Sequence, residues 1–279
     1  MNYRHAFHAG NFADVLKHSV LLAVLDALLQ KPAPLLALDT HAGRGLYALD
    51  AAAAQRTGEY QGGIARLAGA RGLPPPLARY RAAVQACAAQ HPRHYPGSPW
   101  LLLHALRSED QAVLCELEPG EAQALRALCA GDARAHVHQR DGYEALPALL
   151  PPAQRRGLVL IDPPYEAQEG EFDAIKSALA RALQRFAQGV YLVWYPIKLA
   201  RTREAFWRWL AGCGARSVLA AELAVRAENS PLRMNGCGMA ILNPPWKLDA
   251  ALATALPVLA QLLGETGQGQ HRLHWLRRE

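Results

Sequence analysis

An acid, two prolines and a tyrosine follow one of the most apolar segments of this sequence. The run Leu158–Ile161 leads directly into Asp162, Pro163, Pro164 and Tyr165. Proline has no backbone N–H and stiffens the chain, which leaves the carbonyl of Pro163 to accept a hydrogen bond. The amine of a nucleobase could donate one hydrogen to Asp162 and the other to that carbonyl, while Tyr165 stacks on the base, worth about 1–3 kcal/mol.

This motif predicts methyl transfer to the exocyclic amine of a base taken out of its stack. Asp162, Pro163 and Tyr165 are then the catalytic candidates. The structural alternative is a rigid Pro-Pro turn with no chemical role.

A second motif is the glycine-rich turn that follows the first apolar run. Asp39 is followed by Thr40, His41, Ala42, Gly43, Arg44 and Gly45. Small residues let the backbone approach a ligand closely at the carboxyl end of a strand. The third glycine of a dinucleotide fingerprint is missing, and no Gly-Lys-Ser/Thr is present. The turn therefore suits S-adenosylmethionine better than NAD or a P-loop nucleotide, with an ordinary glycine turn as the alternative.

Two more acids stand at predicted strand ends. Glu116 follows one apolar run, and Asp141 with Gly142 follows the next. A carboxylate at the first position could accept hydrogen bonds from ribose hydroxyls. The second could bind the amine of a cofactor adenine. A single acid at such a place is usually only solvated, but several on one sheet edge favour a cofactor site.

Short apolar runs alternating with helix-like segments must position these residues. This pattern predicts an α/β fold with a mainly parallel sheet of seven strands. In methyltransferase sheets the last strand runs antiparallel to the others. The predicted strands are Leu35–Leu38, Ala112–Cys115, His136–Val137, Leu158–Ile161, Val190–Trp194, Ser217–Val225 and Gly238–Leu242.

One connection is longer than a simple crossover needs. We expect residues 50–97 to form a small inserted helical subdomain, with residues 1–49 and 98–279 as the methyltransferase domain. Within the latter, residues 1–30 should form an N-terminal arm and a helix from about Asp14 to Leu29.

A second Pro-Pro motif follows the last predicted strand. It consists of Asn243, Pro244, Pro245 and Trp246. Because that strand should run antiparallel to the others, its end should face away from the cofactor edge. We expect a structural role for this motif.

Composition sets further bounds. The chain has 279 residues, 51% of them hydrophobic, which excludes a disordered or fibrous protein. No apolar run reaches the ~18–20 residues of a membrane helix. Five cysteines without a CxxC pair indicate neither disulfides nor zinc, so we expect a soluble cytoplasmic protein. The net charge is +6, and 25 of the 30 basic residues are arginine, which fits nucleic-acid binding or coding bias.

The N-terminal arm mixes aromatic, basic and polar residues. His5 and His8 lack a nearby cysteine or paired carboxylate, so a metal site is not expected. Asp14 and His18, four residues apart on the predicted helix, could form a cap or an ion pair. The arm itself could cover the cofactor or contact the substrate.

The sequence resembles the bacterial 23S rRNA adenine-N6-methyltransferase J family along almost its whole length. The motifs YRHAFHAGNFADVLKH, LDTHAGRGLY, RTGEY, YPGSP, LIDPPYE, LVWYP and MAILNPPWKL carry this resemblance in order. It implies a Rossmann-like class I methyltransferase fold with a helical insert and an antiparallel last strand. It also implies S-adenosylmethionine as methyl donor, S-adenosylhomocysteine as product, no metal, and N6 of one adenine in 23S rRNA as acceptor. It gives no sign of an obligate protein partner, and we expect a monomer.

The resemblance also implies roles for single residues. RNA would be contacted by Tyr3 and Arg4, and Arg44 between the glycines should point outward. The cofactor contacts implied are Lys17, His18, His41, Gly43, Ser98, Glu116, Asp141, Gly142 and Asp162.

Other functions stay open at this stage. DPPY also suits a DNA adenine-N6 or an rRNA guanine-N2 methyltransferase. A catalytically inactive RNA-binding assembly factor is a non-enzymatic alternative. A nicotinamide oxidoreductase is disfavoured by the missing glycine.

Overall fold

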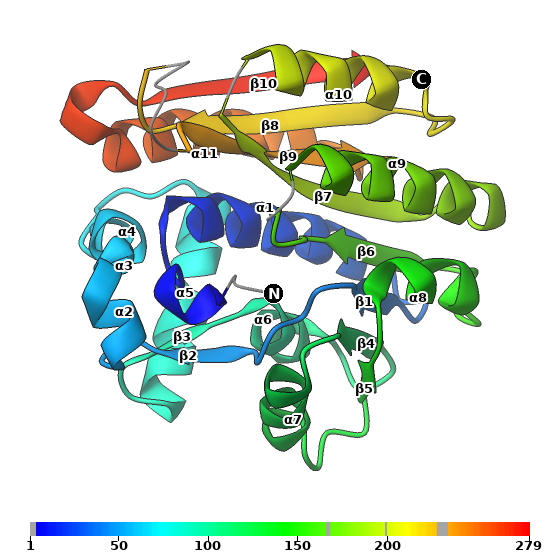
Figure 1. Cartoon of the computed structure of the whole chain (residues 1–279), viewed down its shortest axis with the longest axis horizontal. Helices are drawn as coiled ribbons and strands as arrows, with labels where there is room; N and C mark the ends of the chain where they lie inside the picture. Colours follow the sequence, from blue (N-terminus) through cyan, green and yellow to red (C-terminus); the bar gives the residue numbers. More distant parts are fainter. Residues whose placement is uncertain (1–3, 166–167, 199, 228–233) are drawn as a thin grey trace.

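The protein is seen in a computed structural model that describes residues 4–165, 168–198, 200–227 and 234–279. Its main sheet has eight strands in the order β10-β8-β9-β7-β6-β1-β4-β5 (Figure 1). The strands, from the β5 edge, are β5 (Ala135–Gln139), β4 (Gln111–Glu116), β1 (Leu36–Asp39), β6 (Gly157–Ile161), β7 (Val190–Ile197), β9 (Gly236–Leu242), β8 (Val218–Ala224) and β10 (Gln270–Arg277).

Strand direction divides the sheet into two parts. Neighbours from β5 to β7 are parallel, whereas β9 runs antiparallel to β7 and to β8. All seven predicted strands are present, and the predicted antiparallel strand is confirmed as β9. The structure adds an eighth, β10, which pairs antiparallel with β8. Its sequence QHRLHWLR has no continuous apolar run because it is a largely exposed edge strand, which explains why the sequence pattern missed it.

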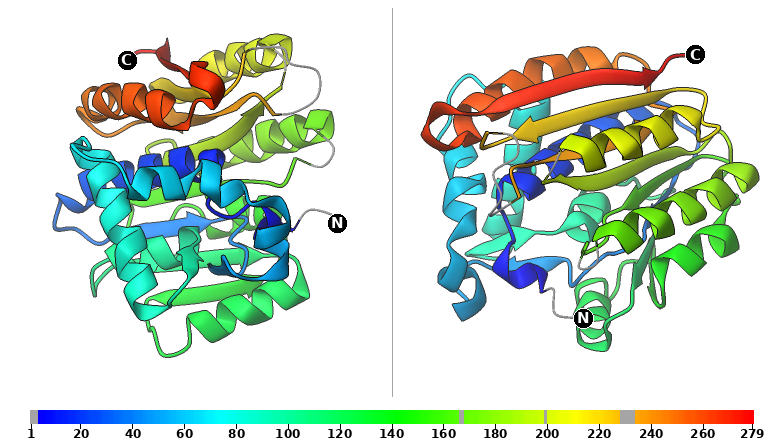
Figure 2. Two further views of the ribbon diagram at one scale, coloured as in Figure 1. Left: turned by 90° about the vertical axis from the view of Figure 1, so that its left-hand side faces the viewer. Right: turned by 45° about the horizontal axis from the view of Figure 1, so that its top comes forward.

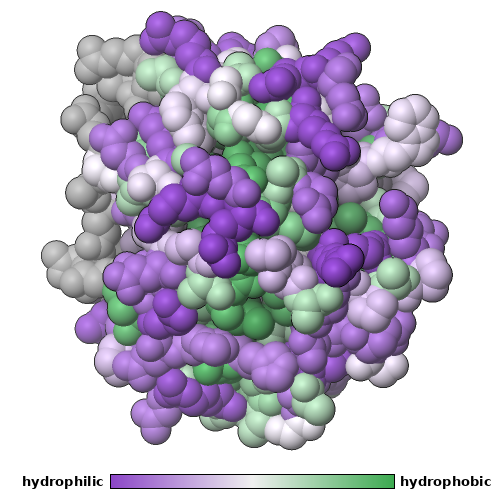
Figure 3. All heavy atoms as spheres, turned by 90° about the vertical axis from the view of Figure 1, so that its right-hand side faces the viewer, coloured by the Kyte–Doolittle hydropathy of each residue, from purple (hydrophilic) through white to green (hydrophobic). Residues whose placement is uncertain are grey.

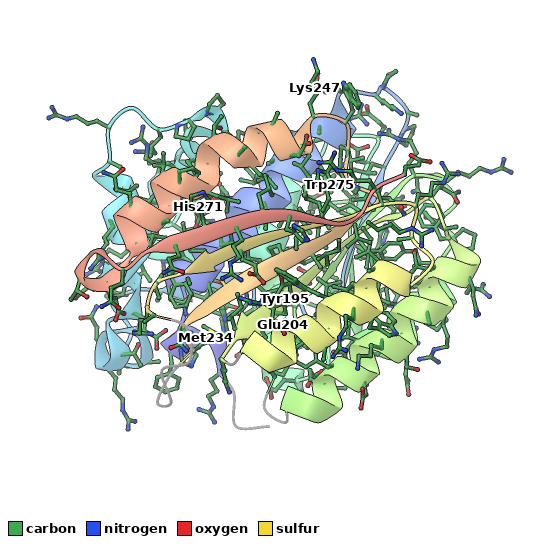
Figure 4. The ribbon with its side chains drawn as sticks, turned by 90° about the horizontal axis from the view of Figure 1, so that it is seen from above. Tyr195, Glu204, Met234, Lys247, His271 and Trp275 are labelled. Carbon is green, nitrogen blue, oxygen red and sulfur yellow. The ribbon has the colours of Figure 1, made fainter. Side chains whose placement is uncertain are left out.

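Helices cover both faces of the sheet, as buried parallel strands require (Figure 4). One face packs in a core with α1 (Phe12–Leu29), α5 (Pro75–Gln90), α6 (Ser98–Ala105), α7 (Pro119–Leu128) and α11 (Leu248–Leu263). The other packs with α8 (Gly142–Leu149), α9 (Gln168–Arg185) and α10 (Ala200–Gly212). No helix in the described ranges is long and apolar enough to cross a membrane.

The segment 50–97 is helical, as its sequence predicts. It holds α2 (Ala52–Thr57), α3 (Glu59–Gly62), α4 (Ile64–Ala68) and α5, and its base is a small antiparallel pair of β2 (Leu46–Ala48) and β3 (His94–Pro96). Leu77, Tyr80 and Cys87 of α5 belong to the same core as α1. The segment therefore shares its core with the rest of the chain, and its status as a separate subdomain stays a prediction.

The N-terminal arm lies beside this segment. A short 3-10 helix, η1 (His5–Phe7), precedes α1 and lies next to α2, whereas α1 runs from that side through the middle of the molecule (Figure 2). Helix α1 begins at Phe12 because Asn11 caps it: the Asn11 Oδ1 accepts the N–H groups of Ala13 and Asp14. A second 3-10 helix, η2 (Glu265–Gly267), leads into β10.

Candidate active site

A large cavity opens at the carboxyl ends of the parallel strands. Its volume of about 1580 Å³ exceeds the ~300–1,000 Å³ of ordinary ligand sites, which leaves room for a cofactor and a base together. Every predicted site residue within the described ranges lines it. These are Arg4, Lys17, His18, His41, Gly43, Ser98, Glu116, Asp141, Gly142, Asp162, Pro163 and Tyr165. Tyr3 lies outside the described residues.

Two glycines let neighbouring turns meet at the cavity floor. Gly43 has φ +62°, and a Cβ there would lie 2.3 Å from the Tyr47 hydroxyl. A Cβ on Gly142 would lie 2.0 Å from the carbonyl oxygen of Thr40. A side chain on Gly142 would push the turns after β1 and β5 apart, whereas one on Gly43 would clash with Tyr47 at the end of its own turn. Arg44, expected to point outward, lies at the cavity and forms a two-point ion pair with Glu121.

The carboxylates at the strand ends are tied to backbone N–H groups. The Glu116 Oε2 accepts from the N–H of Gly43 at 2.8 Å and the Oε1 from that of Glu118 at 2.7 Å. Burial raises the pKa of Glu116 despite these bonds. Asp141 caps α8 through its Oδ1, which accepts from the N–H of Tyr143 at 2.7 Å. Both groups are held rigidly at the cavity wall, as a cofactor site requires.

His41 is held in one tautomer by its neighbour. The Thr40 hydroxyl donates its only hydrogen to the carbonyl of Leu160 at 3.0 Å and lies 2.7 Å from the His41 Nδ1. It can therefore only accept from His41, so the Nδ1 carries the proton and the Nε2 is an acceptor. Burial lowers the pKa of His41 to about 4, which keeps the ring neutral.

A chain of ionisable side chains leads from the N-terminal arm to Asp162. The Lys17 Nζ lies 2.6 Å from the Asp162 Oδ2 and 2.8 Å from the Asp14 Oδ1. The Asp14 Oδ2 is 3.0 Å from the His5 Nε2 and also accepts from the N–H of Gly10. Burial opposes the charge of Lys17, but the two carboxylates raise its pKa well above the usual range. Lys17 therefore stays charged against Asp162.

The pairing of Asp14 with His18 is wrong. Asp14 pairs instead with Lys17, the residue before His18 on α1, and with His5 of η1. The His18 Nδ1 instead lies 2.7 Å from the Tyr95 hydroxyl. Burial and the charge of Lys17 lower the pKa of His18 to about 3, so this ring is neutral and cannot serve as an ion-pair partner.

Tyr165 lines the cavity from an unusual backbone position. Its φ is +50°, and only 7% of its surface is exposed. The hydroxyl donates to the Trp194 carbonyl at 2.7 Å, and the ring meets Phe172 and Trp194 edge-on. The hydroxyl bond and the two aromatic contacts fix the ring. Its stacking on a base stays a prediction.

The second Pro-Pro motif lies at the opposite ends of the strands from the cavity. Because β9 is antiparallel, Asn243 stands where β7 and β8 begin. Its Oδ1 accepts from the N–H of Arg216, and its Nδ2 donates to the carbonyls of Ala187 and Gly189. The expected structural role is confirmed by these bonds. Figure 3 shows the face at which β7 begins, where hydrophilic side chains surround smaller hydrophobic areas.

The cavity residues fit S-adenosylmethionine. The cofactor carries hydroxyl and amine donors for Glu116 and Asp141 and a carboxylate that needs donors. The Nε2 of His18 is buried at the cavity wall and has no hydrogen-bond partner, which a bound acceptor would supply. Among the described residues no group of three His, Cys, Asp or Glu side chains could hold a metal ion.

Two site residues escaped the sequence reasoning. Asp14 lies three residues before Lys17, a spacing that could have identified the pair. His5 reaches Asp14 only because η1 folds back on α1, and no spacing rule predicts that turn.

Known proteins match the chain along its length. The family model described as Ribosomal RNA large subunit methyltransferase D, RlmJ, matches residues 32–277. The chain is 42% identical over 277 residues to Ribosomal RNA large subunit methyltransferase J of Escherichia coli, covering 99% of both. It is 39% identical over 281 residues to the protein of that name from Haemophilus influenzae, covering 100% of both.

A solved structure agrees with the fold. A crystal structure of a Legionella pneumophila protein, 36% identical, superposes with a TM-score of 0.86 over 96% of this chain and 98% of its own. The predicted Rossmann-like class I methyltransferase fold is confirmed. The chain belongs to the RlmJ family of ribosomal RNA large subunit methyltransferases.

Proposed function

We propose that this protein transfers a methyl group from S-adenosylmethionine to N6 of one adenine in 23S rRNA. The observation that carries the proposal is the position of Asp162 and Pro163, at the end of β6 and on the wall of a cavity large enough for cofactor and base. The names of the relatives from Escherichia coli and Haemophilus influenzae, which specify ribosomal RNA of the large subunit, support the substrate class.

The cofactor supplies an electrophilic methyl group. The adenine amine is a weak nucleophile because its lone pair is delocalised into the ring. Hydrogen bonds from the amine to the Asp162 carboxylate and the Pro163 carbonyl would localise that lone pair and direct it toward the methyl group. After transfer, the nitrogen carries a positive charge and readily loses a proton to Asp162 or water.

Lys17 bears on the role of Asp162. Its ammonium group donates to the Asp162 Oδ2 at 2.6 Å, which fixes the carboxylate and leaves the second oxygen to accept from the substrate amine. This geometry suits Asp162 to orienting the amine.

The remaining site residues would bind the two substrates. Glu116 would accept from the cofactor ribose and Asp141 from its adenine amine, while Arg4 on the cavity wall would contact RNA, with Tyr3 beside it in the sequence. We infer that the protein acts in the cytoplasm as a monomer, without a metal or an obligate protein partner.

Incorporation of tritiated methyl groups tests the substrate. We expect labelling of 23S rRNA from cells lacking this activity, none of duplex DNA, and N6-methyladenosine as the product by mass spectrometry. Labelled guanine, or labelled duplex DNA with unlabelled rRNA, would contradict the proposal. Failure to bind S-adenosylmethionine in calorimetry would favour the non-enzymatic assembly factor.

A further inference from the structure

Two buried tyrosines lie behind His18, on the side away from the cavity. Tyr80 of α5 is 0% exposed, and Tyr95 of β3 is 1% exposed. Their hydroxyl oxygens are 2.7 Å apart, and the Tyr95 hydroxyl is 2.7 Å from the His18 Nδ1. The proposed reaction gives these hydroxyls no role, yet each is a polar group placed in a core that is otherwise apolar.

The three groups form a chain whose direction can be worked out. Each hydroxyl has one hydrogen to donate, and a neutral imidazole has one N–H and one acceptor nitrogen. If Tyr80 donates to Tyr95 and Tyr95 donates to the His18 Nδ1, both hydroxyl hydrogens are used. In the opposite direction, His18 donates to Tyr95 and Tyr95 to Tyr80, whose own hydrogen is then left without an acceptor among the described residues.

Each direction leaves one buried donor without a partner among the described residues, the His18 Nε2–H in the first and the Tyr80 O–H in the second. The first is favoured because His18 lines the cavity, where a ligand can accept from the Nε2–H, whereas the Tyr80 hydroxyl is enclosed in the core. The second direction would also leave the Nε2 lone pair without a donor. The first direction requires a neutral ring, which the burial of His18 and the charge of Lys17 provide. The His18 hydrogen must then be on the Nε2, the one ring nitrogen that has no partner in the described structure.

We propose that the hydroxyls of Tyr80 and Tyr95 hold His18 in its Nε2–H tautomer, so that this residue meets the cofactor as a hydrogen-bond donor. The Nε2–H then suits an acceptor oxygen, and the strongest acceptor of S-adenosylmethionine is its carboxylate. The contact with the cofactor rests on the proposed function, whereas the tautomer itself does not.

The relay also gives the segment 50–97 a part in the site. Tyr80 lies within it on α5, and Tyr95 lies at its end on β3. Both are positioning residues, since they act through His18 and do not line the cavity themselves. Tyr95 is the more important of the two, because its hydroxyl contacts the His18 ring directly. Tyr80 acts only by donating a hydrogen bond to the Tyr95 hydroxyl.

Nuclear magnetic resonance reads the tautomer directly. The full-length protein would be labelled with 15N-histidine, and long-range 1H–15N correlations of the ring would be recorded without cofactor. His18→Gln assigns the His18 signals among the 11 histidines. We expect a protonated Nε2 and an unprotonated Nδ1 in the wild-type protein. A protonated Nδ1 would overturn the proposal, whether or not any variant folds.

Variants then connect the tautomer with binding. We expect Tyr95→Phe to produce a mixture of tautomers and to raise the Kd for S-adenosylmethionine about tenfold, with the KM for RNA unchanged. Tyr80→Phe should keep the Nε2–H tautomer and raise the Kd by a smaller factor. An unchanged His18 spectrum in Tyr95→Phe would overturn the relay.

Tyr191→Phe is the matched control. Tyr191 is also fully buried, but its hydroxyl donates to backbone carbonyls of Ala182 and Phe186, in the core on the other face of the sheet. It should lose similar stability and leave both the His18 spectrum and the Kd unchanged. If the wild-type protein shows the Nε2–H tautomer but does not bind S-adenosylmethionine, the proposed function fails and the tautomer assignment stands.

Discussion

Asp162 combines two properties that usually conflict, an accessible acceptor and a fixed orientation. Its carboxylate reaches the cavity, while Lys17 binds one oxygen at 2.6 Å and is itself held by Asp14. The lysine therefore limits rotation of the carboxylate and leaves the second oxygen for the substrate amine. Preorganised acceptors of this kind account for much of the rate enhancement in enzymes.

Asp162→Ala removes this acceptor. We expect methyl transfer to fall by a factor on the order of 100 to 1,000, as when a preorganised polar group is lost, while the fold persists. Asp162→Asn keeps one acceptor oxygen and should retain measurable activity if Asp162 mainly orients the amine. Single-turnover transfer to rRNA by purified, folded variants gives both rates. Near wild-type transfer by Asp162→Ala would exclude Asp162 from the site.

Glu116→Ala should act on the cofactor and spare the RNA. Loss of a charge-assisted hydrogen bond to ribose should cost about 1.5–3 kcal/mol of binding free energy. Glu116→Gln is the milder variant, because one oxygen can still accept from the N–H of Gly43 and support the glycine turn. Calorimetry with S-adenosylmethionine measures the loss. The assignment fails if a folded Glu116→Ala binds the cofactor as tightly as the wild type.

At the scale of elements, α2, α3 and α4 hold the N-terminal arm against α1. The N–H of Ile64 donates to the Gly10 carbonyl at 2.8 Å, and the Thr57 hydroxyl donates to that of Phe7. Glu59 accepts from the Asn11 amide at 3.0 Å and pairs with His8. The arm carries His5 to Asp14, so these helices indirectly support the chain of ionisable side chains that ends at Asp162.

Two adjacent glycines test this contact. A Cβ on Gly63 would lie 2.1 Å from the Gly10 carbonyl oxygen, whereas one on Gly62 meets nothing within 4 Å. Gly63→Ala should therefore force the arm away and cost about 1–3 kcal/mol of unfolding free energy. Gly62→Ala should be neutral or stabilising by up to about 1 kcal/mol. Urea unfolding of both variants checks the difference, and equal stabilities would mean that the arm is not packed as described.

The His8–Glu59 pair makes the contact depend on pH. The hydrogen bond to Glu59 raises the pKa of His8 above 6.5, and bonds from His8 and Asn11 lower that of Glu59 below 4.5 against burial. His8 therefore adds stability that is fully present below pH 6.5 and is lost as pH rises through its folded pKa. Glu59 adds stability present above pH 4.5 and lost as pH falls through its folded pKa.

The stability difference between the wild-type protein and Glu59→Gln should consequently be largest between pH 4.5 and 6.5. Because both side chains are about one-third exposed, solvent screens the pair and the effect should be small. Thermal unfolding across pH 4 to 9 measures it, with His8→Gln as the second arm of the cycle. A difference that does not vary with pH would rule out the ion pair.

At the scale of the whole molecule, the sequence predicts the strands and the residues at their ends. It does not predict contacts between segments that are far apart in the chain. Six of the predicted strands are short apolar runs that are largely buried, whereas the edge strand β5 has partly exposed side chains and is marked only by His136–Val137 ahead of Asp141. Strand β10 has mostly exposed side chains and no apolar run that would predict it. The site residues at the ends of these strands were found from motifs and resemblance. The contacts of His5 with Asp14 and of Tyr80 with Tyr95 join parts of the chain whose approach no local pattern encodes.

The two Pro-Pro motifs show how strand direction separates chemistry from support. Asp162 follows the parallel strand β6 and reaches the cavity. Asn243 follows the antiparallel β9 and therefore lies at the opposite ends of the strands. There its amide joins the segments that precede β7 and β8, with three hydrogen bonds to backbone groups. Its φ of +53° is also a conformation that asparagine tolerates better than alanine.

Asn243→Ala should therefore lower the unfolding free energy by about 1–3 kcal/mol, because three hydrogen bonds to exposed and partly buried backbone groups are lost. The rate of methyl transfer per folded molecule should stay near that of the wild type. Unfolding in urea and transfer at a temperature well below the midpoint measure the two effects separately. Asp162→Ala should show the reverse, a stable protein with little activity. An inactive but stable Asn243→Ala would contradict the assignment of the chemistry to the carboxyl ends of the parallel strands.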